Sequence, residues 1–521
     1  MSDEKTTEIP KAEGADHWCG YLNDALTVFV VGASGDLAKK KTYPSLYDLY
    51  RHKFLPPDTV ICGYARSPKD DASFRGQIKP FLKGGTDDDK DAFLAMCIYR
   101  SGAYDSVEAV GTVFEELKVA EKASGRPVAN RLFYFAIPPS VFVPIGKSLK
   151  EAVIGPGDKE GRNGGWDRLI IEKPFGKDSE SFEKLSSDMG ALYTEDHIYR
   201  IDHYLGKEMV KNLMVLRFTN TYCEPLWNRN YIGSVTITFK EDFGTKGRGG
   251  YFDGYGIIRD IIQNHLLQVM SIVAMEPPVA CMGKDYSNYV RNEKVKVLNC
   301  IRPAKLENTV LGQYLAGEDE AGYTEDPTVP DDSVTPTFAT MVLYVDNPRW
   351  DGVPFILKAG KALNERKAEV RIQYKQPPGA AAMFPGETIP NNELVLKLQP
   401  DEAMYLKANV KQPGLSTSPV ASELDMTYKS RFKDATLFDA YTRLILDVLR
   451  GGQAAFVRDD ELRAAWKIFT PLLHRIEREK VRPIPYEYGS RGPKESDELL
   501  ASVGYAYHGG AYQWEGPSSK M

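Results

Sequence analysis

The chain has 521 residues, a length that suits two large domains better than a single core. Its 42% hydrophobic and 26% charged residues are typical of a soluble globular protein, and no apolar run is long enough to span a membrane. The formal net charge of -6 argues against a nucleic-acid-binding protein, because neutralising phosphates requires a basic face.

The ends of the chain and the cysteines bear on localisation. Residues 1–20 form a polar stretch that we expect to be a disordered tail, because it lacks the apolar core of a signal peptide or membrane anchor. The six cysteines lie far apart without a C-x-x-C pair, which predicts reduced thiols in an intracellular protein. The last three residues, Ser519-Lys520-Met521, differ by one conservative change from the Ser-Lys-Leu peroxisomal signal. We expect a cytoplasmic protein and leave partial peroxisomal import open.

The first predicted strand, residues 26–31, is an apolar, β-branched run typical of a parallel sheet buried on both faces. A glycine turn at residues 32–38 and a helical stretch follow it, with Leu46 and Leu49 facing inward. Small residues let the backbone approach a pyrophosphate, and a helix N-terminus supplies N–H donors. The turn therefore predicts a dinucleotide site, although a tight structural turn would explain its G-x-x-G spacing nearly as well. The candidate contacts are Gly32, Ser34, Gly35, Asp36 and Leu37.

A second predicted strand, residues 59–67, follows at the distance expected for a βαβ unit. An NAD enzyme would place an acid near its end for the ribose 2′-hydroxyl, whereas this strand ends in Arg66. A guanidinium fits a 2′-phosphate, so the position favours NADP over NAD, the alternative being an ordinary surface arginine.

Further strands are predicted at residues 132–137 and 168–171, and their alternation with helical stretches predicts a doubly wound sheet. Lys173 follows the second of these strands, at the carboxyl edge where such sheets bind ligands. A buried structural lysine is less favoured, because an unpaired buried ammonium is costly. Pro174 is a candidate for a cis peptide bond beside Lys173.

Residues 200–207 concentrate polar chemistry in one octapeptide containing Asp202, His203, Tyr204 and Lys207. Such a set suits an anionic, hydroxylated ligand, because His, Tyr and Lys at a helix start can converge on phosphate oxygens. Taken alone, the cluster could equally cap a helix or solvate a surface.

The pattern changes after this octapeptide. Residues 234–240 alternate polar and apolar side chains, which predicts a strand with one face buried and the other facing solvent or a ligand, within an antiparallel sheet flanked by helices. The glycines of residues 244–250 lack a following βαβ frame and predict a loop.

Residues 257–270 predict a buried helix whose polar groups need partners. Asp260 and Asn264 lie one turn apart, whereas His265 lies about 140° around an α-helix from Asp260. From the residues alone, His265 is better explained as a core histidine.

Basic residues cluster between positions 351 and 371: Lys358, Lys361, Arg366, Lys367 and Arg371. A solvated basic face is the usual explanation, but in an acidic chain the cluster favours a site for a sugar phosphate, a nucleotide or both. Residues 376–392 predict a loop. The aromatic tail, with Tyr505, Tyr507, Tyr512 and Trp514, suits either packing or a stacking platform.

Several stretches together resemble the glucose-6-phosphate dehydrogenase family, from the glycine turn almost to the C-terminus. They are GASGDLAKKK at residues 32–41, GYARS at 63–67, EKPFG at 172–176, RIDHYLGKEMVKN at 200–212, GTKGRGGYFD at 244–253, GIIRDIIQNHLLQ at 256–268 and KAGKALNERKAEVRIQ at 358–373. After the polar tail at residues 1–20, we expect a Rossmann-type NADP-binding domain at 21–202 and a larger α+β domain with a mainly antiparallel sheet at 203–521, which the resemblance implies binds substrate and oligomerises.

The resemblance also implies a reaction: oxidation of glucose 6-phosphate at C1 to the lactone with NADP, the first step of the oxidative pentose phosphate pathway, without a metal. It makes Asp202 and His265 the catalytic pair, which replaces the core-histidine explanation, and places Lys173 among the catalytic and cofactor-binding residues. The implied substrate residues are His203, Tyr204, Lys207, Glu241, Asp260, Lys361, Arg366 and Gln399.

Animal members of the family hold a second, structural NADP and form homodimers or homotetramers. The corresponding residues here are Lys358, Lys367, Arg371, Lys397, Arg491, Tyr507 and Trp514, where Lys397 replaces an arginine and weakens a bidentate contact. The alternatives are a hexose-6-phosphate dehydrogenase of broader use and a non-catalytic NADP sensor.

Overall fold

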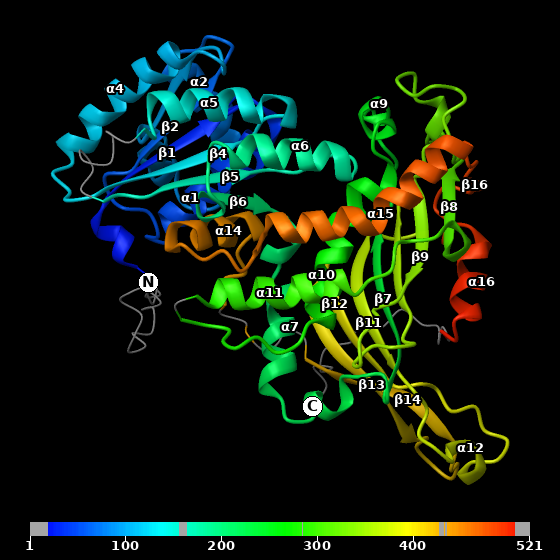
Figure 1. The fold of residues 1–521 in the computed structure, drawn as a ribbon. Helices are drawn as coiled ribbons and strands as arrows, with labels where there is room; N and C mark the ends of the chain where they lie inside the picture. Colours follow the sequence, from blue (N-terminus) through cyan, green and yellow to red (C-terminus); the bar gives the residue numbers. More distant parts are fainter. Residues whose placement is uncertain (1–18, 156–163, 284, 427–431, 433–434, 506–521) are drawn as a thin grey trace. The chain divides into compact units, whose positions relative to one another are not determined.

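The structure, a computed structural model, describes residues 19–155, 164–283, 285–426, 432 and 435–505 (Figure 1). The predicted tail therefore lies almost wholly outside the described residues. The chain forms two compact units: the first comprises residues 1–175, 184–201 and 438–458, and the second comprises 176–183, 202–437 and 459–521. The predicted boundary near residue 202 agrees with this division, but the prediction assigned residues 438–458 to the second domain, whereas they belong to the first unit.

The first unit is a seven-stranded sheet with the order β15-β6-β5-β4-β1-β2-β3, in which every pair is parallel except β6 with β15. Its strands are β1 (Ala25–Val31), β2 (Val60–Ala65), β3 (Cys97–Ser101), β4 (Ala129–Phe135), β5 (Asp167–Ile171), β6 (Ile198–Ile201) and β15 (Phe456–Val457). The order 3-2-1-4-5-6 is that of a doubly wound dinucleotide fold, so the predicted fold class is confirmed.

Helices cover both faces of this sheet. On one face, Phe114 packs against the rings of Phe29 and Phe133; on the other, helical residues such as Leu46 and Leu49 join Val28 and Val30 in one core. The helical elements are η2 (Gly20–Asn23), η3 (Ala38–Thr42), α1 (Tyr43–Arg51), α2 (Asp71–Ile78), η4 (Lys79–Phe81), α3 (Asp87–Ala95), α4 (Val107–Ala123), η5 (Pro139–Val141), α5 (Phe142–Ala152), η8 (Glu195–His197) and α14 (Ala440–Arg450), while α6 (Ser179–Gly190) begins in the second unit and ends in the first.

The second unit is a nine-stranded sheet with the order β14-β13-β12-β11-β7-β10-β9-β8-β16. Only β7 with β10 and β8 with β16 pair in parallel, so the prediction of a mainly antiparallel sheet is confirmed. The strands are β7 (Ile232–Lys240), β8 (Thr309–Tyr314), β9 (Phe338–Leu343), β10 (Phe355–Gly360), β11 (Lys367–Tyr374), β12 (Glu393–Gln399), β13 (Ala403–Lys411), β14 (Pro419–Asp425) and β16 (Ile484–Tyr486).

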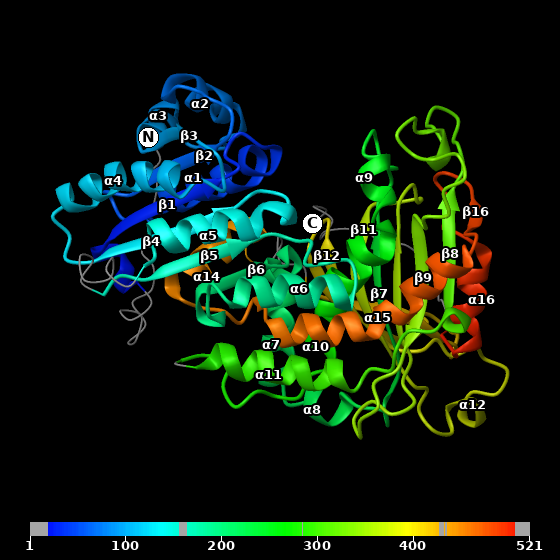
Figure 2. The same cartoon turned by 45° about the horizontal axis from the view of Figure 1, so that its top comes forward.

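Helices α7, α10, α11 and α15 lie on one side of this larger sheet (Figures 1 and 2). The helical elements of the unit are η9 (His203–Gly206), α7 (Glu208–Thr219), α8 (Cys223–Leu226), α9 (Gly249–Asp253), η10 (Ile258–Leu266), α10 (Leu267–Ala274), α11 (Tyr286–Asn299), η11 (Leu306–Asn308), η12 (Tyr323–Glu325), α12 (Ala380–Met383), α15 (Asp459–Glu479) and α16 (Lys494–Ser502). Within the described residues, no helix has both the length and the apolarity that crossing a bilayer requires.

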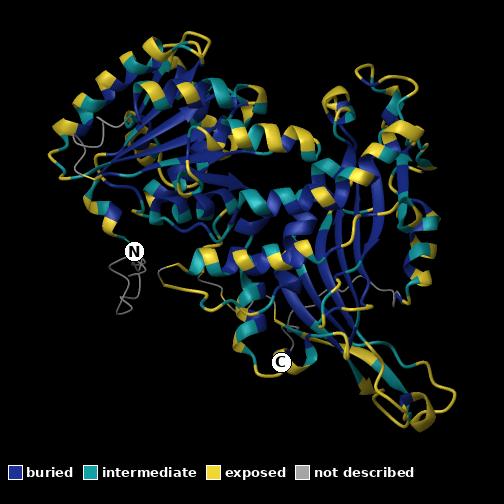
Figure 3. Ribbon diagram, in the orientation of Figure 1, coloured by how far each residue is buried: buried dark blue, intermediate teal, exposed yellow. Residues whose placement is uncertain are grey.

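Two local predictions need correction. β7 has no solvent-facing side: its polar residues Thr236, Thr238 and Lys240 are 3%, 6% and 7% exposed (Figure 3). Burial is tolerated because neighbouring polar groups pair with them; the Lys240 ammonium, for example, donates to Asn364 and Glu365. The glycine stretch 244–250 is a loop only as far as Arg248, since Gly249 begins α9.

A buried ion pair joins two helices of the second unit and yields a stability prediction. Lys294 of α11 and Glu461 of α15 are both fully buried, with Nζ and Oε2 2.7 Å apart. We expect Lys294→Met to lower the free energy of unfolding by about 3–5 kcal/mol, because it strands a buried carboxylate. The double variant Lys294→Met with Glu461→Leu should recover most of the loss in urea denaturation. A single-variant loss below about 1 kcal/mol would contradict this account.

Candidate active site

The centre of the candidate site is a buried pair, Asp202 and His265. Asp202 follows β6 and caps η9, accepting the backbone N–H of Tyr204 at 3.0 Å, while His265 lies in η10. The two side chains belong to residues 3% and 1% exposed, and Oδ1 of Asp202 lies 2.6 Å from Nδ1 of His265. His265 is thus buried, as a core histidine would be. It is, however, hydrogen-bonded to Asp202, the residue with which the family resemblance pairs it.

The charge of Asp202 determines which histidine nitrogen carries the proton. Burial raises the pKa of Asp202, but the electrostatic attraction of His265, the hydrogen bond from its ring and the attraction of His203 outweigh burial and bring the pKa down to about 2. The carboxylate is therefore ionised near neutral pH and can only accept a hydrogen bond. Nδ1 of His265 must then be the donor, which makes Nε2 the nitrogen that can take up a proton.

Aromatic rings enclose this pair. The Tyr204 ring stacks on the His265 imidazole, with centroids 4.6 Å apart and planes at 22°, and the His203 ring meets the same imidazole edge-on at 4.6 Å. The Tyr204 hydroxyl and Oδ2 of Asp202 are buried and have no hydrogen-bond partner among the described residues. Buried polar atoms are usually satisfied, so these two indicate a place for a ligand or water.

Cationic and acidic groups lie beside the rings. Nζ of Lys361 is 2.5 Å from Oε2 of Glu241 and 3.9 Å from Oδ2 of Asp260, and Nζ of Lys207 donates to Oε1 of Gln399 at 2.6 Å. The same Lys207 ammonium lies 5.0 Å from the centre of the Tyr204 ring.

Tyr204 connects this set to Glu241 and to Arg366. Burial raises its pKa well above the usual range; Asp202 and Glu241 raise it further, and Arg366 lowers it. Every predicted substrate residue lies in the second unit. Contacts join Tyr204 to His203 and Lys207, and Lys207 to Gln399. Lys361 contacts Glu241 and Asp260, and this second group is linked to Tyr204 by the electrostatic effect of Glu241. All of them except the exposed Arg366 are buried or half-buried.

The helix that carries His265 is wound differently from the prediction. Residues Ile258–Leu266 form a π-helix, with α-helix resuming at Leu267. The wider i→i+5 turn brings positions five apart nearer to one face, so the 140° separation expected between Asp260 and His265 does not apply. π-segments of this kind are rare and often occur at functional sites.

The glycine turn of the first unit has the geometry of a phosphate cradle. Gly32 has φ +82°, and a Cβ there would lie 2.3 Å from the Ala136 carbonyl oxygen, so only glycine fits. Helical residues begin at Asp36, and both Ser34 and Gly35 are half-buried in the turn before it. The backbone N–H groups of this helix start suit an anion.

Arg66 and Lys173 occupy the carboxyl edge of the same sheet. Arg66 directly follows β2 and is exposed, with its guanidinium 5.7 Å from the centre of the Tyr104 ring, an arrangement that fits a nucleotide 2′-phosphate. Lys173 follows β5, is half-buried and precedes a cis peptide bond to Pro174, as the sequence suggested. Gln399, in the second unit, also precedes a cis proline.

The basic cluster does not form a solvated surface, as its usual explanation would require. Lys358, Lys361 and Arg371 are 6%, 8% and 9% exposed. Arg371 pairs with Glu369 and Glu393, and burial lowers the pKa of Lys358 to about 8. A charged sheet face results, formed by Lys240, Lys358, Lys367, Glu369, Arg371 and Glu393, with Lys397 beside it on β12.

The tail residues Tyr507, Tyr512 and Trp514 lie outside the described residues. Tyr505 is buried and packs with Val342, Ile356 and Leu500, so it serves packing. Arg491 is exposed and forms an ion pair with Asp497 at 3.3 Å.

One feature of this region escaped sequence reasoning. Arg259, beside the candidate Asp260, is 10% exposed at its side chain and donates to the carbonyl oxygen of Lys177 at 2.7 Å. The sequence did contain a signal for this role: Arg259 is a cation in a mostly apolar helix, and a cation that is largely buried requires partners.

Comparison with known proteins covers nearly the whole chain. The family model "Glucose-6-phosphate dehydrogenase, NAD binding domain" matches residues 29–212, and "Glucose-6-phosphate dehydrogenase, C-terminal domain" matches residues 214–508. Glucose-6-phosphate 1-dehydrogenase of Dictyostelium discoideum is 52% identical over 497 residues, which cover 95% of this chain and 97% of that protein.

Two further comparisons agree with these. Cytoplasmic glucose-6-phosphate 1-dehydrogenase 5 of Arabidopsis thaliana is 52% identical over 506 residues and covers 95% of this chain and 94% of that protein. A solved structure of glucose-6-phosphate dehydrogenase in complex with its substrate glucose-6-phosphate has a TM-score of 0.87 at 44% identity, covering 93% of this chain and 99% of that chain.

Proposed function

The chain belongs to the glucose-6-phosphate dehydrogenase family, and we propose that it oxidises D-glucose 6-phosphate at C1 to 6-phospho-D-glucono-1,5-lactone, the first step of the oxidative pentose phosphate pathway. The observation that carries this proposal is the buried 2.6 Å contact between Asp202 and His265, the two residues that the family resemblance makes the catalytic pair. NADP, when bound, supplies the acceptor for the hydride that leaves C1.

His265 acts as the general base in this proposal. Oxidation at C1 requires the O1 hydroxyl to lose its proton, and an imidazole titrates near neutral pH. Because Nδ1 donates to Asp202, Nε2 receives the proton. The ionised Asp202 holds the ring in this tautomer and stabilises the imidazolium that forms.

The cationic residues bind and orient the sugar phosphate. The residues assigned to the C6 phosphate are His203, Tyr204, Lys207 and Lys361, and those assigned around the sugar are Lys173, Glu241, Asp260, Arg366 and Gln399. Lys207 and Lys361 are held by Gln399 and Glu241, so their ammonium groups are pre-positioned. Fixed groups of this kind use binding energy to orient the reacting carbon.

The cofactor proposed is NADP, held by Gly32, Ser34, Gly35, Asp36, Leu37, Arg66 and Lys173. The start of a helix at Asp36, directly after the glycine turn, supports binding of a pyrophosphate, and the cation after β2 supports a 2′-phosphate. Lys173 is assigned to both the cofactor and the reaction.

Arg66→Ala tests the choice of cofactor. We expect the KM for NADP to rise roughly 10- to 100-fold, the worth of a charge-assisted contact to the 2′-phosphate, while the KM for NAD changes little. Steady-state rates with each cofactor measure this, with Arg126→Ala, a half-buried arginine paired with Asp58, as the control. An equal rise in the KM for NADP and for NAD would show that Arg66 does not bind the 2′-phosphate.

We also retain a second, structural NADP as a proposal. The charged sheet face supports it, because Lys358, Lys367 and Arg371 share that face with Lys397 nearby on β12. Arg491, Tyr507 and Trp514 complete the proposed set. Counting tightly bound NADP per subunit decides the matter: two per subunit supports the site, and one excludes it.

Assembly and localisation follow as proposals from the family. A homodimer or homotetramer built through the larger sheet is supported by β14, an edge strand whose residues are exposed or half-exposed. Sedimentation velocity would give the state. We infer a cytoplasmic protein. Peroxisomal import can be tested by comparing the location of two fluorescent fusions, one that carries Ser519-Lys520-Met521 at its C-terminus and one that lacks it.

The experiment that tests the function follows reduced-nicotinamide absorbance with glucose 6-phosphate and the purified chain, using NADP and NAD in parallel. Rapid NADP reduction supports the proposal, and galactose 6-phosphate tests the breadth of substrates. A folded chain that binds NADP but reduces neither cofactor would instead be a sensor.

A further inference from the structure

The π-helical turn that carries His265 is closed by a side chain. Asn264 is half-buried, and its amide oxygen accepts the backbone N–H of His265 at 2.7 Å. The nitrogen of the same amide donates to the backbone carbonyl of Arg259 at 3.3 Å. One amide group therefore ties together the first turn of η10 and the residue that carries the imidazole.

The hydrogen bonds of the Asn264 side chain favour a widened turn over a regular α-helix. Asparagine inside a helix usually competes with the backbone for hydrogen bonds and weakens the regular ladder. Here it bonds to the carbonyl of Arg259, five positions before it, and to the N–H of His265, the next residue, so it spans backbone groups six positions apart, which suits a widened turn. Because it holds the backbone of His265, it also sets the direction in which the imidazole leaves the helix towards Asp202.

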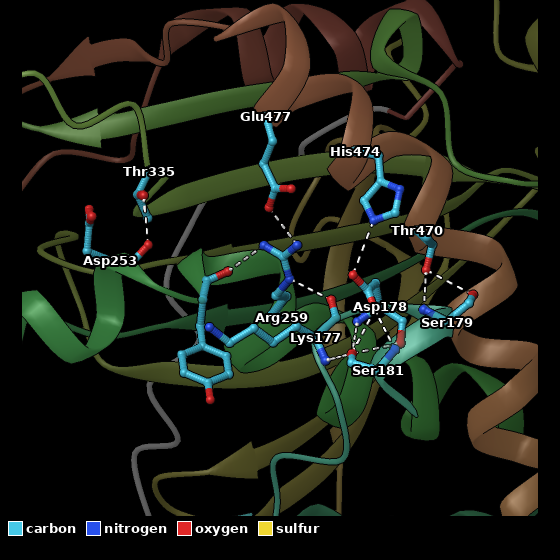
Figure 4. A network of polar contacts seen from close by, with 11 residues as sticks. Lys177, Asp178, Ser179, Ser181, Asp253, Arg259, Thr335, Thr470, His474 and Glu477 are labelled. Carbon is cyan, nitrogen blue, oxygen red and sulfur yellow. Dashed lines mark hydrogen bonds and ion pairs between the residues drawn. The ribbon is translucent and has the colours of Figure 1, made fainter. Parts of the chain in front are cut away.

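Arg259 anchors the same turn from outside. Its guanidinium donates to the carbonyl oxygens of Lys177 at 2.7 Å and Tyr255 at 3.4 Å and pairs with Glu477 of α15 at 2.6 Å (Figure 4). The Arg259 side chain is only 10% exposed, whereas the Glu477 side chain is 55% exposed and Lys177 is exposed as well, so the contact with the Tyr255 carbonyl is the most sheltered of the three. Arg259 therefore takes part through two groups: its carbonyl oxygen accepts from Asn264, and its guanidinium donates to the Lys177 carbonyl.

We propose that Asn264 and Arg259 are positioning residues for the reaction: together they lock the π-helical turn so that the His265 imidazole stays aligned with Asp202. The role rests on the proposed function of His265 as the base. Neither residue touches the reacting atoms in this account, and both act through the backbone of His265.

Asn264→Ala, Asn264→Asp and Arg259→Lys test the proposal in the full-length chain. We expect Asn264→Ala to lower kcat roughly 10- to 50-fold with less than a threefold change in the KM for glucose 6-phosphate, because a small misplacement of a catalytic group is costly. The kinetic isotope effect on kcat with 1-deuterated glucose 6-phosphate should rise, since a misaligned base makes C1–H cleavage slower. A purely structural role would change the amount of active protein and leave the isotope effect unchanged.

The other two variants keep part of each contact. Asn264→Asp retains an acceptor for the His265 N–H but loses the donor to Arg259, and Arg259→Lys retains the charge but loses the fork of donors. Both should show intermediate losses of kcat with raised isotope effects, and they carry the test if Asn264→Ala does not fold.

Matched controls separate the outcomes. Asn220→Ala removes an amide-to-carbonyl bond of the same kind, to Leu216 at 2.9 Å, and Glu477→Gln removes only the negative charge of the exposed partner of Arg259; both should keep the wild-type kcat and isotope effect. An active wild type with unchanged kcat and isotope effect in all three test variants overturns the inference and leaves the proposed function standing. A wild type inactive with glucose 6-phosphate and either cofactor overturns both.

Discussion

His265→Asn is expected to lower kcat by roughly 10²- to 10⁴-fold while leaving the affinity for glucose 6-phosphate largely intact. The imidazole is the group assigned to take the O1 proton, and asparagine cannot accept a proton near neutral pH. The phosphate contacts assigned to Lys207 and Lys361 come from other elements and remain in place. Steady-state kinetics gives kcat, and isothermal titration calorimetry gives the substrate affinity.

A second histidine offers the matched control for this substitution. His474 lies on α15 and is 48% exposed at its side chain, and its Nε2 lies 3.3 Å from the Asp178 carboxylate. His474→Asn should keep wild-type turnover. Near-normal turnover in His265→Asn would remove His265 from the role of base, and loss of substrate binding with turnover would show that it mainly binds the sugar.

The elements of the first unit could be predicted because their sequence signals are local. Residues 26–31, 132–137 and 168–171 are apolar runs, and strands buried on both faces require such runs. The glycine turn was equally visible, since the positive φ of Gly32 and the close Ala136 carbonyl leave no alternative to glycine. The return of β15 to the edge of this sheet had no such signal, because a two-residue strand has no periodicity.

The second unit was harder to predict because its polar residues are buried in pairs. Alternation along β7 suggested an exposed side, but Lys240 is buried through contacts with Asn364 and Glu365, which lie more than a hundred residues away. The solvated face that usually explains such a basic cluster was excluded in the same way, since Arg371 is buried against Glu369 and Glu393, which are its partners in space. Pairing of this kind is a property of the assembled sheet.

The candidate site shows a similar division. Asp202, His203, Tyr204 and Lys207 could be singled out from one octapeptide, yet the partner of Asp202 could not be identified from spacing. The α-helical repeat used for His265 gave the wrong angle, because hydrophobic periodicity does not distinguish a nine-residue π-segment from an α-helix. The pairing of His265 with Asp202 could be predicted from the family resemblance but not from the residue pattern alone.

Asp202→Asn is expected to lower kcat by roughly 10²- to 10³-fold, less than the loss of the base itself, because it removes the group that fixes the imidazole and stabilises its charged form. The acidic limb of the pH profile of kcat/KM should move to lower pH, since an imidazole without a neighbouring carboxylate is protonated less readily. Rates measured between pH 5 and pH 9 test both effects. An unchanged pH profile would mean that Asp202 does not act on the base.

Because the pKa of Asp202 is about 2, we expect no titration of this carboxylate in the wild type between pH 5 and pH 9. This pKa lies below the ordinary 3.8, so the ionised group stabilises the fold above pH 3.8, and this contribution is lost as the pH falls through about 2. In the wild type, the acidic limb therefore reports the base and not Asp202. If Asp202 acts only through His265, then Asp202→Asn should cost little further rate in the His265→Asn background, because two residues that work as one unit are not additive. A full additional loss in the double variant would instead place Asp202 in direct contact with the substrate.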